Sequence, residues 1–404
     1  MHTDMPLITT LASALGLSLV LGFIAARLQL PALVGYLLAG VLLGPHTPGY
    51  VADVGLAAQL AEIGVMLLMF GVGLHFSLTD LLAVRRVAVP GAVVQIGVAT
   101  GLGAWLAWHW GWSWAGAVVF GLALSVASTV VLLRALEARG ELASEHGRIA
   151  IGWLVVEDLA MVLVLVLLPA LVTAPGHATT PDTHAVLLTL ARTLLTVGAF
   201  VAVMLLVGRR ALPWLLQQIA RTNSRELFTL CVVAVAVGIA SGAAALFGVS
   251  VALGAFFAGL VLRESDFGHR AAEESLPFRD AFAVLFFVSV GMLFDPLVLL
   301  ERPVQVLGVT GVIVLGKSVV AAAWVLALRR PLSQALGIAA SLAQVGEFSF
   351  ILVGLGGSLG VLPPEAQSLI VAGALLSIAL NPLWMSLMPW LQRWMAARWA
   401  WARD

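Results

Sequence analysis

Long apolar segments follow one another along almost the whole chain, and they restrict the fold more than any other feature. A membrane-spanning helix needs about 20 consecutive, mainly apolar residues. The 404 residues are 61% hydrophobic and 10% charged, whereas about a quarter are charged in a typical soluble domain. The sequence therefore predicts an all-α membrane protein, a single transmembrane domain over residues 1–404 with thirteen transmembrane helices. The segments are 6–26, 31–44, 56–75, 87–108, 114–133, 148–171, 186–208, 226–246, 248–262, 277–294, 304–328, 333–359 and 366–390.

Arginine residues alternate along this order of segments. Eighteen of them lie in the odd-numbered connections or after the last segment, and the even-numbered connections hold only Arg192 and Arg302. Cytoplasmic loops of membrane proteins carry the excess of Lys and Arg. The pattern therefore predicts that the N-terminus lies outside and the C-terminus in the cytoplasm. Residues 391–404, rich in Trp and Arg, are expected to form an interfacial cytoplasmic tail.

The two halves of the chain contain similar segments at a nearly constant offset of 216 to 219 residues. GYLLAGVLLGP (35–45) is similar to GAFFAGLVLRES (254–265), LAEIGVMLLMFGVGL (60–74) to RDAFAVLFFVSVGML (279–293), and GLALSVASTVVLL (121–133) to GIAASLAQVGEFSFIL (337–352). Because seven segments separate the copies, the copies have opposite orientations. This predicts an inverted repeat, which is typical of transporters. We place repeat one at about 1–171, a linker span at about 186–208 and repeat two at about 226–390.

Small polar residues interrupt the fifth and twelfth segments at equivalent places in the repeat. Ser125, Ser128 and Thr129 interrupt one segment, and Ser341, Gln344 and Gly346 interrupt the other. Transporters with inverted repeats have discontinuous helices there, with free backbone groups at the midplane of the membrane. The alternative is that each hydroxyl bonds to its own helical turn. Two interruptions at equivalent positions favour a binding site.

Five ionisable residues lie inside apolar segments: Glu62, Glu157, Asp158, Lys317 and Glu347. Each costs about 2.5–3.5 kcal/mol at a helix centre, so such residues usually have a function. Lys317 is the only lysine of the chain. A lysine changes its protonation more readily on burial than an arginine does, so a specific need for it is expected.

Glu157 and Asp158 are neighbours and therefore point about 100° apart around a helix. We expect Glu157 to pair with Lys317, at an attraction of about 4 kcal/mol for a separation of about 4 Å. This leaves Asp158 to bind either a proton or a hard alkali cation. The alternative is a charge cluster that only holds helices together.

Four further residues are candidates for supporting roles. Glu347 is expected to neutralise the partial positive charge at the N-terminus of a half-helix. Glu62 fits either a pathway residue or a paired structural acid, and Gln344 and Ser341 are candidate pathway residues. No histidine pair has the spacing of a metal site, so no metal is expected beyond a transported cation.

Eight motifs together resemble the monovalent cation:proton antiporter-2 family, in particular its Kef-type potassium/proton antiporters of the YbaL/RosB-like branch. They are GYLLAGVLLGP, LAEIGVMLLMFGVGL, LALSVASTVVLL, GWLVVEDLAMVL, ELFTL, LGAFFAGLVLRES, DAFAVLFFVSVGM and SLAQVGEFSFIL. The resemblance implies a sodium/proton antiporter fold with two crossed broken helices, a homodimer and a bacterial inner membrane location. It also implies exchange of potassium for protons, with Asp158 as the ion-binding acid, Ser125, Ser128 and Thr129 as hydroxyls of the broken helix, and Lys317 as the core lysine.

Two departures from the Kef pattern leave alternatives open. Kef-type proteins have Gln–Asp where this chain has Glu157–Asp158, a pair closer to electrogenic sodium/proton antiporters, so sodium remains an alternative cation. Kef-type proteins continue into a cytosolic nucleotide-binding regulatory domain, which we do not expect within these residues.

Other classes of protein fit the sequence less well. A ligand-gated potassium channel would use rings of carbonyls or acids around a pore. An intramembrane hydrolase would need two carboxyl groups on facing elements. No enzyme activity, cofactor or nucleic-acid partner is expected.

Overall fold

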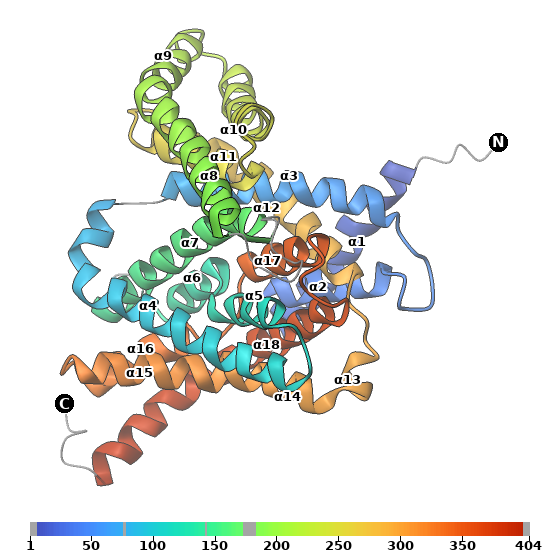
Figure 1. Ribbon diagram of the computed structural model, residues 1–404, viewed down its shortest axis with the longest axis vertical. Coiled ribbons are helices and arrows are strands. Elements are labelled where there is room, and N and C mark those ends of the chain that lie inside the picture. The colour runs from blue at the N-terminus through green and yellow to red at the C-terminus, as the bar shows by residue number, and fades with distance from the viewer. Residues whose placement is uncertain (1–5, 76–77, 142–143, 173–182, 399–404) are drawn as a thin grey trace. The chain divides into compact units, whose positions relative to one another are not determined.

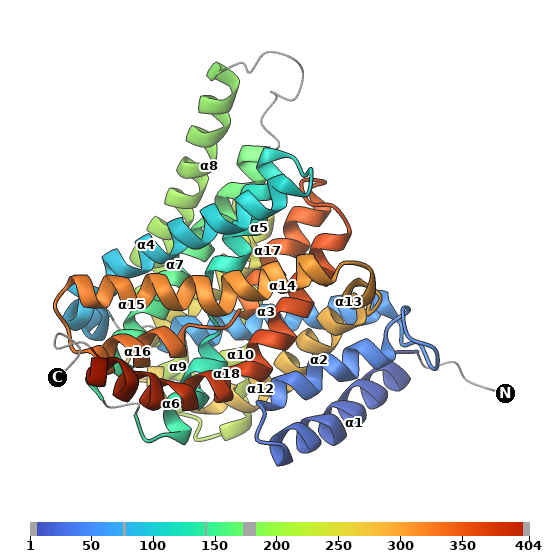
Figure 2. The same cartoon turned by 90° about the horizontal axis from the view of Figure 1, so that it is seen from below.

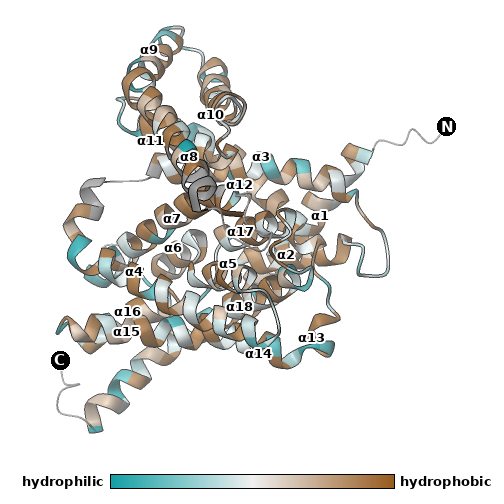
Figure 3. Ribbon diagram, in the orientation of Figure 1, coloured by the Kyte–Doolittle hydropathy of each residue, from teal (hydrophilic) through white to brown (hydrophobic). Residues whose placement is uncertain are grey.

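The computed structural model describes residues 6–75, 78–141, 144–172 and 183–398. Within these ranges the regular structure is entirely helical. Nine helical stretches in the described chain are long and apolar enough to cross a membrane, and hydrophobic residues cover most of the helical turns in Figure 3. The remaining predicted segments form two short helices and two broken helices. The predicted all-α membrane fold with thirteen spans, two of them broken, is therefore confirmed.

The chain forms two compact units, each assembled from segments that are distant in the sequence. The described residues of the first unit are 6–15, 52–75, 162–172 and 183–289, and those of the second unit are 16–51, 78–141, 144–161 and 290–398. The boundaries fall within α1 (Pro6–Arg27), α7 (Glu145–Val172) and α12 (Gly268–Met292).

The first unit contains, besides parts of these three helices, α3 (Val54–His75), α8 (Thr183–Val203), the π-helical turn η1 (Met204–Gly208), α9 (Arg209–Ala220), α10 (Arg225–Phe247) and α11 (Val251–Arg263). Helices α3 and α11 pack with their backbones in close approach. A Cβ atom at Gly259 would lie only 2.2 Å from the carbonyl O of Phe70. Small residues at helix interfaces permit such approach inside membranes.

The second unit contains the other eleven elements. They are α2 (Ala32–Leu43), α4 (Leu78–His109), α5 (Trp114–Ser125), α6 (Thr129–Ala138), α13 (Val298–Glu301), α14 (Pro303–Gly311), the π-helical turn η2 (Val312–Gly316), α15 (Lys317–Ala327), α16 (Leu332–Ser341), α17 (Glu347–Ser358) and α18 (Glu365–Arg398). Figures 1 and 2 show α14 and α15 continuing one another beside α4. A buried apolar cluster joins α4, α6, α7, α15 and α16, with Trp153 fully buried in it. This cluster packs the helices that carry most of the ionisable candidates.

Four helices extend well beyond the predicted segments. Helix α4 begins at Leu78, α12 begins at Gly268, α18 continues to Arg398, and α8 continues through η1 into α9 as far as Ala220. In α9 the buried residues Leu212 and Leu216 are four positions apart and so lie on one helical face. The helical chain therefore continues past residue 208, where the predicted segment ends.

Candidate functional site

Both interrupted segments are broken helices, as predicted. Helix α5 ends at Ser125, residues 126–128 are not helical, with Val126 extended, and α6 begins at Thr129. Helix α16 ends at Ser341, and α17 begins at Glu347. Each break leaves backbone N–H and C=O groups that no longer bond within a helix, and buried groups of this kind need other partners. All of these residues belong to the second unit.

The two breaks cross in direct contact between their backbones. A Cβ atom at Gly346 would lie 2.5 Å from the carbonyl O of Ala127 and 2.9 Å from Cα of Ser128. The side chain of Gln344 joins the same two segments, because its Oε1 accepts from N of Ser128 at 2.7 Å and its Nε2 donates to O of Ser128 at 3.1 Å. Gln344, predicted as a pathway residue, thus occupies the crossing itself.

Glu157 lies on α7 and is fully buried, with both carboxylate oxygens bonded to the protein. Its Oε2 accepts from the backbone N of Ala127 at 2.8 Å, and its Oε1 accepts from Nε2 of Gln95 on α4. The backbone N–H of Ala127 is one of the groups released by the first break. Glu157 therefore satisfies a buried backbone donor and connects α7 to α4.

Asp158 follows directly on α7 and is only 4% exposed. Its Oδ2 accepts from Oγ1 of Thr129 at 3.0 Å. Its Oδ1 is buried and has no hydrogen-bond partner among the residues that the structure describes. A buried carboxylate oxygen without a donor is costly, so Asp158 presents an acceptor to which a proton or a cation could bind.

Lys317 is fully buried and begins α15, directly after the π-helical turn η2. Its Nζ donates to the backbone O of Gln344 at 2.8 Å. Lys317 and Glu157 attract each other electrostatically. The predicted direct pairing is nevertheless wrong in its geometry, since no ion pair joins them in the described chain. The ammonium donates instead to the carbonyl of Gln344 in the second break, and both oxygens of Glu157 accept from the N–H groups of Gln95 and Ala127.

Glu347 is the first residue of α17 and is 2% exposed. Its position in the first turn agrees with the expected neutralisation of a helix N-terminus. Its Oε2 accepts from Oγ of Ser128 at 3.1 Å. Consecutive hydroxyl residues of the first break, Ser128 and Thr129, therefore contact two different carboxyl groups.

The remaining predicted residues are less closely connected with this cluster. Oγ of Ser125 donates to O of Leu122, and Oγ of Ser341 donates to O of Gly337. Both hydroxyls thus bond to their own helical turn, which was the alternative interpretation of these serines. Glu62 lies in the first unit, exposed on α3.

Sequence reasoning missed Gln95 and the backbone amide of Ala127. Gln95 is fully buried on α4, in a segment where it is the one amide side chain between residues 87 and 108. That isolation within an apolar segment was a usable signal. Nothing in the sequence indicated which backbone N–H would bond to Glu157.

Comparisons with known proteins agree on one family. The family described as "Sodium/hydrogen exchanger, transmembrane" matches residues 14–391. YbaL of Escherichia coli (strain K12), named for cation/proton antiport, is 57% identical over 392 residues, which cover 96% of this chain and 69% of YbaL. KefB of Alkalimonas amylolytica, named for K⁺ efflux antiport, is 34% identical over 95% of this chain and 57% of KefB.

A solved structure has the same fold. The sodium proton antiporter MjNhaP1 from Methanocaldococcus jannaschii, at pH 8, is 17% identical and superposes with a TM-score of 0.70, over 95% of this chain and 98% of that one.

Proposed function

The chain belongs to the family of transmembrane sodium/hydrogen exchangers, and from this premise we propose that it exchanges a monovalent cation for protons across a membrane. Members of this family are transporters rather than enzymes. The chain is a multi-pass membrane protein. We place it in the inner membrane of a bacterium as a homodimer, with its N-terminus outside and its C-terminus in the cytoplasm.

The observation that carries the proposal is the unpartnered Oδ1 of Asp158, buried beside two broken helices. A proton on Asp158 would exclude a cation from this oxygen, and a cation would exclude the proton. Competition at one carboxyl group couples the two movements if only the occupied site crosses the membrane. Thr129, bonded to the other oxygen of Asp158, and Ser128 would supply oxygen atoms nearby, as hard cations prefer.

The charges of the cluster support this mechanism. The buried ionisable side chains in the described chain are Glu157, Asp158, Lys317 and Glu347. With all four ionised, three carboxylates and one ammonium give a formal charge of −2. Such a charge is costly inside a membrane. Protons or alkali cations would supply the missing positive charge.

Potassium is the cation that we propose, because the similar protein KefB is named for K⁺ efflux. Sodium is the second candidate, because the structural neighbour MjNhaP1 is named as a sodium proton antiporter. The adjacent acids Glu157 and Asp158 also favour sodium, because Kef-type potassium/proton antiporters have Gln–Asp at these positions.

Proton flux in proteoliposomes tests the proposal. Gradients of K⁺, Na⁺ or choline are imposed, and internal pH is followed with a dye. We expect K⁺ or Na⁺, but not choline, to drive proton movement. Where one proton competes with one cation, the apparent KM for the cation should rise about tenfold for each unit by which the pH is lowered. Cation flux without proton movement would indicate a channel and refute exchange, and single-channel recording would then be informative.

A further inference from the structure

The side-chain amide of Gln344 lies at the crossing of the two breaks and bonds to backbone groups of both broken helices. Gln344 is fully buried. Its amide bonds to both backbone groups of Ser128, the N–H and the C=O. The N–H of Ser128 has no helical partner, because α5 ends at Ser125, whereas the C=O of Ser128 also accepts from N of Leu132 in the first turn of α6. The side chain of Gln344 thus satisfies the free backbone N–H of the other broken helix and adds a second donor to its C=O.

The groups that contact the carboxylates lie directly beside this amide. Oγ of Ser128 donates to Glu347, and Oγ1 of the next residue, Thr129, donates to Asp158. The backbone O of Gln344 also accepts from Lys317. Any shift of Ser128 relative to Gln344 would therefore move the hydroxyl contacts of Asp158 and Glu347.

The separation of oxygen ligands decides which alkali cation a site prefers. Ions of different radius need different cavity sizes and ligand rigidity, and a binding site must be held within about 0.5 Å of its working geometry. The backbones at the crossing are already in contact at Gly346, so they cannot approach further. The amide of Gln344 prevents them from moving apart.

We propose that Gln344 is a positioning residue that sets the cation preference of the site. Its amide fixes Ser128 and Thr129, and through their hydroxyls the carboxylates of Glu347 and Asp158, at the spacing that suits one alkali cation. Gln344 does this without itself bonding to either carboxylate. The inference rests on the proposed cation/proton exchange at Asp158 and adds the residue that determines its selectivity.

Two substitutions test this role. Gln344→Met keeps the length of the side chain and removes both hydrogen bonds to Ser128, together with the bond from Nε2 to O of Ser341 at 3.3 Å. Gln344→Glu keeps an acceptor for N of Ser128 and loses the donor to O of Ser128. In proteoliposomes, we expect Gln344→Met to change the ratio of the KM values for K⁺ and Na⁺ about tenfold, which is the effect of losing one to two net hydrogen bonds. The turnover should change much less, and Gln344→Glu should be intermediate.

Asn381 provides a matched control. It is a buried amide on α18, and its Nδ2 donates to the backbone O of Ala340 at 2.9 Å. Within the described chain, its side chain forms no hydrogen bond to the first break. Asn381→Leu should lower the melting temperature as Gln344→Met does, and should leave the KM ratio unchanged. An unchanged ratio in Gln344→Met, or an equal change in Asn381→Leu, would overturn the inference.

A second measurement does not depend on transport. Cations that bind the folded protein raise its melting temperature, so the order of stabilisation by Li⁺, Na⁺, K⁺ and Rb⁺ in detergent reports the preference directly. Gln344→Met, or Gln344→Glu if the first variant does not fold, should change that order. If the cations stabilise the wild type in a definite order that the variants change, but the wild type shows no proton-coupled flux, the proposed exchange fails. The role of Gln344 in cation preference then stands. An identical order in wild type and both variants refutes the role of Gln344 alone.

Discussion

Neighbouring residues Glu157 and Asp158 differ in the chemistry of their hydrogen-bond partners. Glu157 accepts from two N–H groups, of Gln95 and Ala127, and an amide N–H can only donate. Asp158 accepts from the hydroxyl of Thr129, which can donate to a carboxylate or accept from a protonated carboxyl. The two N–H donors therefore favour the ionised form of Glu157. The surroundings of Asp158 suit both forms, as proton exchange requires.

The first prediction concerns Asp158. Asp158→Asn removes the proton-binding group and places an amide where a cation would need a carboxylate. We expect proton-coupled cation flux in proteoliposomes to fall to the level of protein-free liposomes. The exposed acid Asp266, changed to Asn, is the control for loss of one negative charge and should retain flux. Full exchange by Asp158→Asn would exclude this residue as the coupling site.

The second prediction concerns Glu157 and Lys317. In Glu157→Gln, the side-chain NH₂ faces one of the two N–H groups, of Gln95 or Ala127, and a neutral oxygen faces the other. The variant also leaves the buried ammonium of Lys317 without its nearby opposite charge. Breaking a buried ion pair on one side typically costs about 3–5 kcal/mol, and we expect a loss near the lower end because the two groups are not in direct contact. Unfolding free energies measured in detergent should show it.

The double variant Glu157→Gln with Lys317→Ala tests whether the two groups depend on each other. Its loss should be smaller than the sum of the single losses by about 1 kcal/mol, in the range measured for interacting neighbours. Strict additivity would mean that Lys317 serves only the carbonyl of Gln344.

At the scale of helices, the site depends on two breaks whose backbones touch. Gly346→Ala would place a methyl group 2.5 Å from the carbonyl O of Ala127. Backbone atoms on both sides would have to separate, at a cost of about 1–3 kcal/mol for overpacking. We expect a lower melting temperature and loss of transport. Gly354→Ala on α17, where no atom beyond the adjacent turns of the same helix lies within 4 Å of the added Cβ, should be tolerated. Equal behaviour of the two variants would argue against a close crossing.

Much of this arrangement could be predicted from sequence at the level of helices. Apolar segment length located the spans, and polar residues such as Ser128 and Gln344 located both breaks. Both signals act along the chain, within a few turns of one helix. The partners of Glu157 and Lys317 could not be predicted in the same way. Apart from the side chain of Gln95, they are a backbone N–H and a backbone C=O, which almost every residue carries, so the sequence does not distinguish Ala127 or Gln344 from their neighbours.

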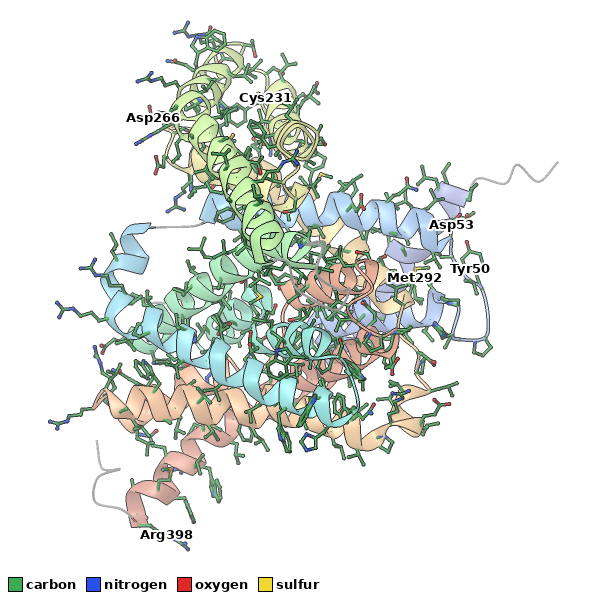
Figure 4. The ribbon with its side chains drawn as sticks, in the orientation of Figure 1. Tyr50, Asp53, Cys231, Asp266, Met292 and Arg398 are labelled. Atoms are coloured by element: carbon green, nitrogen blue, oxygen red, sulfur yellow. The ribbon has the colours of Figure 1, made fainter. Side chains whose placement is uncertain are left out.

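At the scale of the whole molecule, the distribution of arginine predicts which ends of the helices face the cytoplasm. Tyr50 lies in an even-numbered connection and is 54% exposed, and Asp266 lies in an odd-numbered connection between α11 and α12 and is also exposed. Figure 4 labels both residues and the single cysteine, Cys231 on α10. The orientation can be tested at these positions.

In a Cys231→Ala background, Tyr50→Cys should react with a membrane-impermeant thiol reagent added to intact cells. Asp266→Cys should react only after the cells are opened. The parent variant without cysteine gives the background. The reverse pattern would invert the proposed orientation, and labelling of both positions in intact cells would contradict the number of intervening spans.

The anchoring of Glu157 limits the movements that are open to α7. The two acids point about 100° apart around that helix, and Glu157 is tied on one oxygen to α4 and on the other to the first break. A rotation of α7 about its own axis that is large enough to redirect Asp158 would break both of these hydrogen bonds. A state of the protein that opens to the opposite side of the membrane should therefore keep the Gln95–Glu157 and Ala127–Glu157 hydrogen bonds. In that state α4, α7 and both breaks should be displaced together, and Asp158 should keep its direction relative to α4 and the first break.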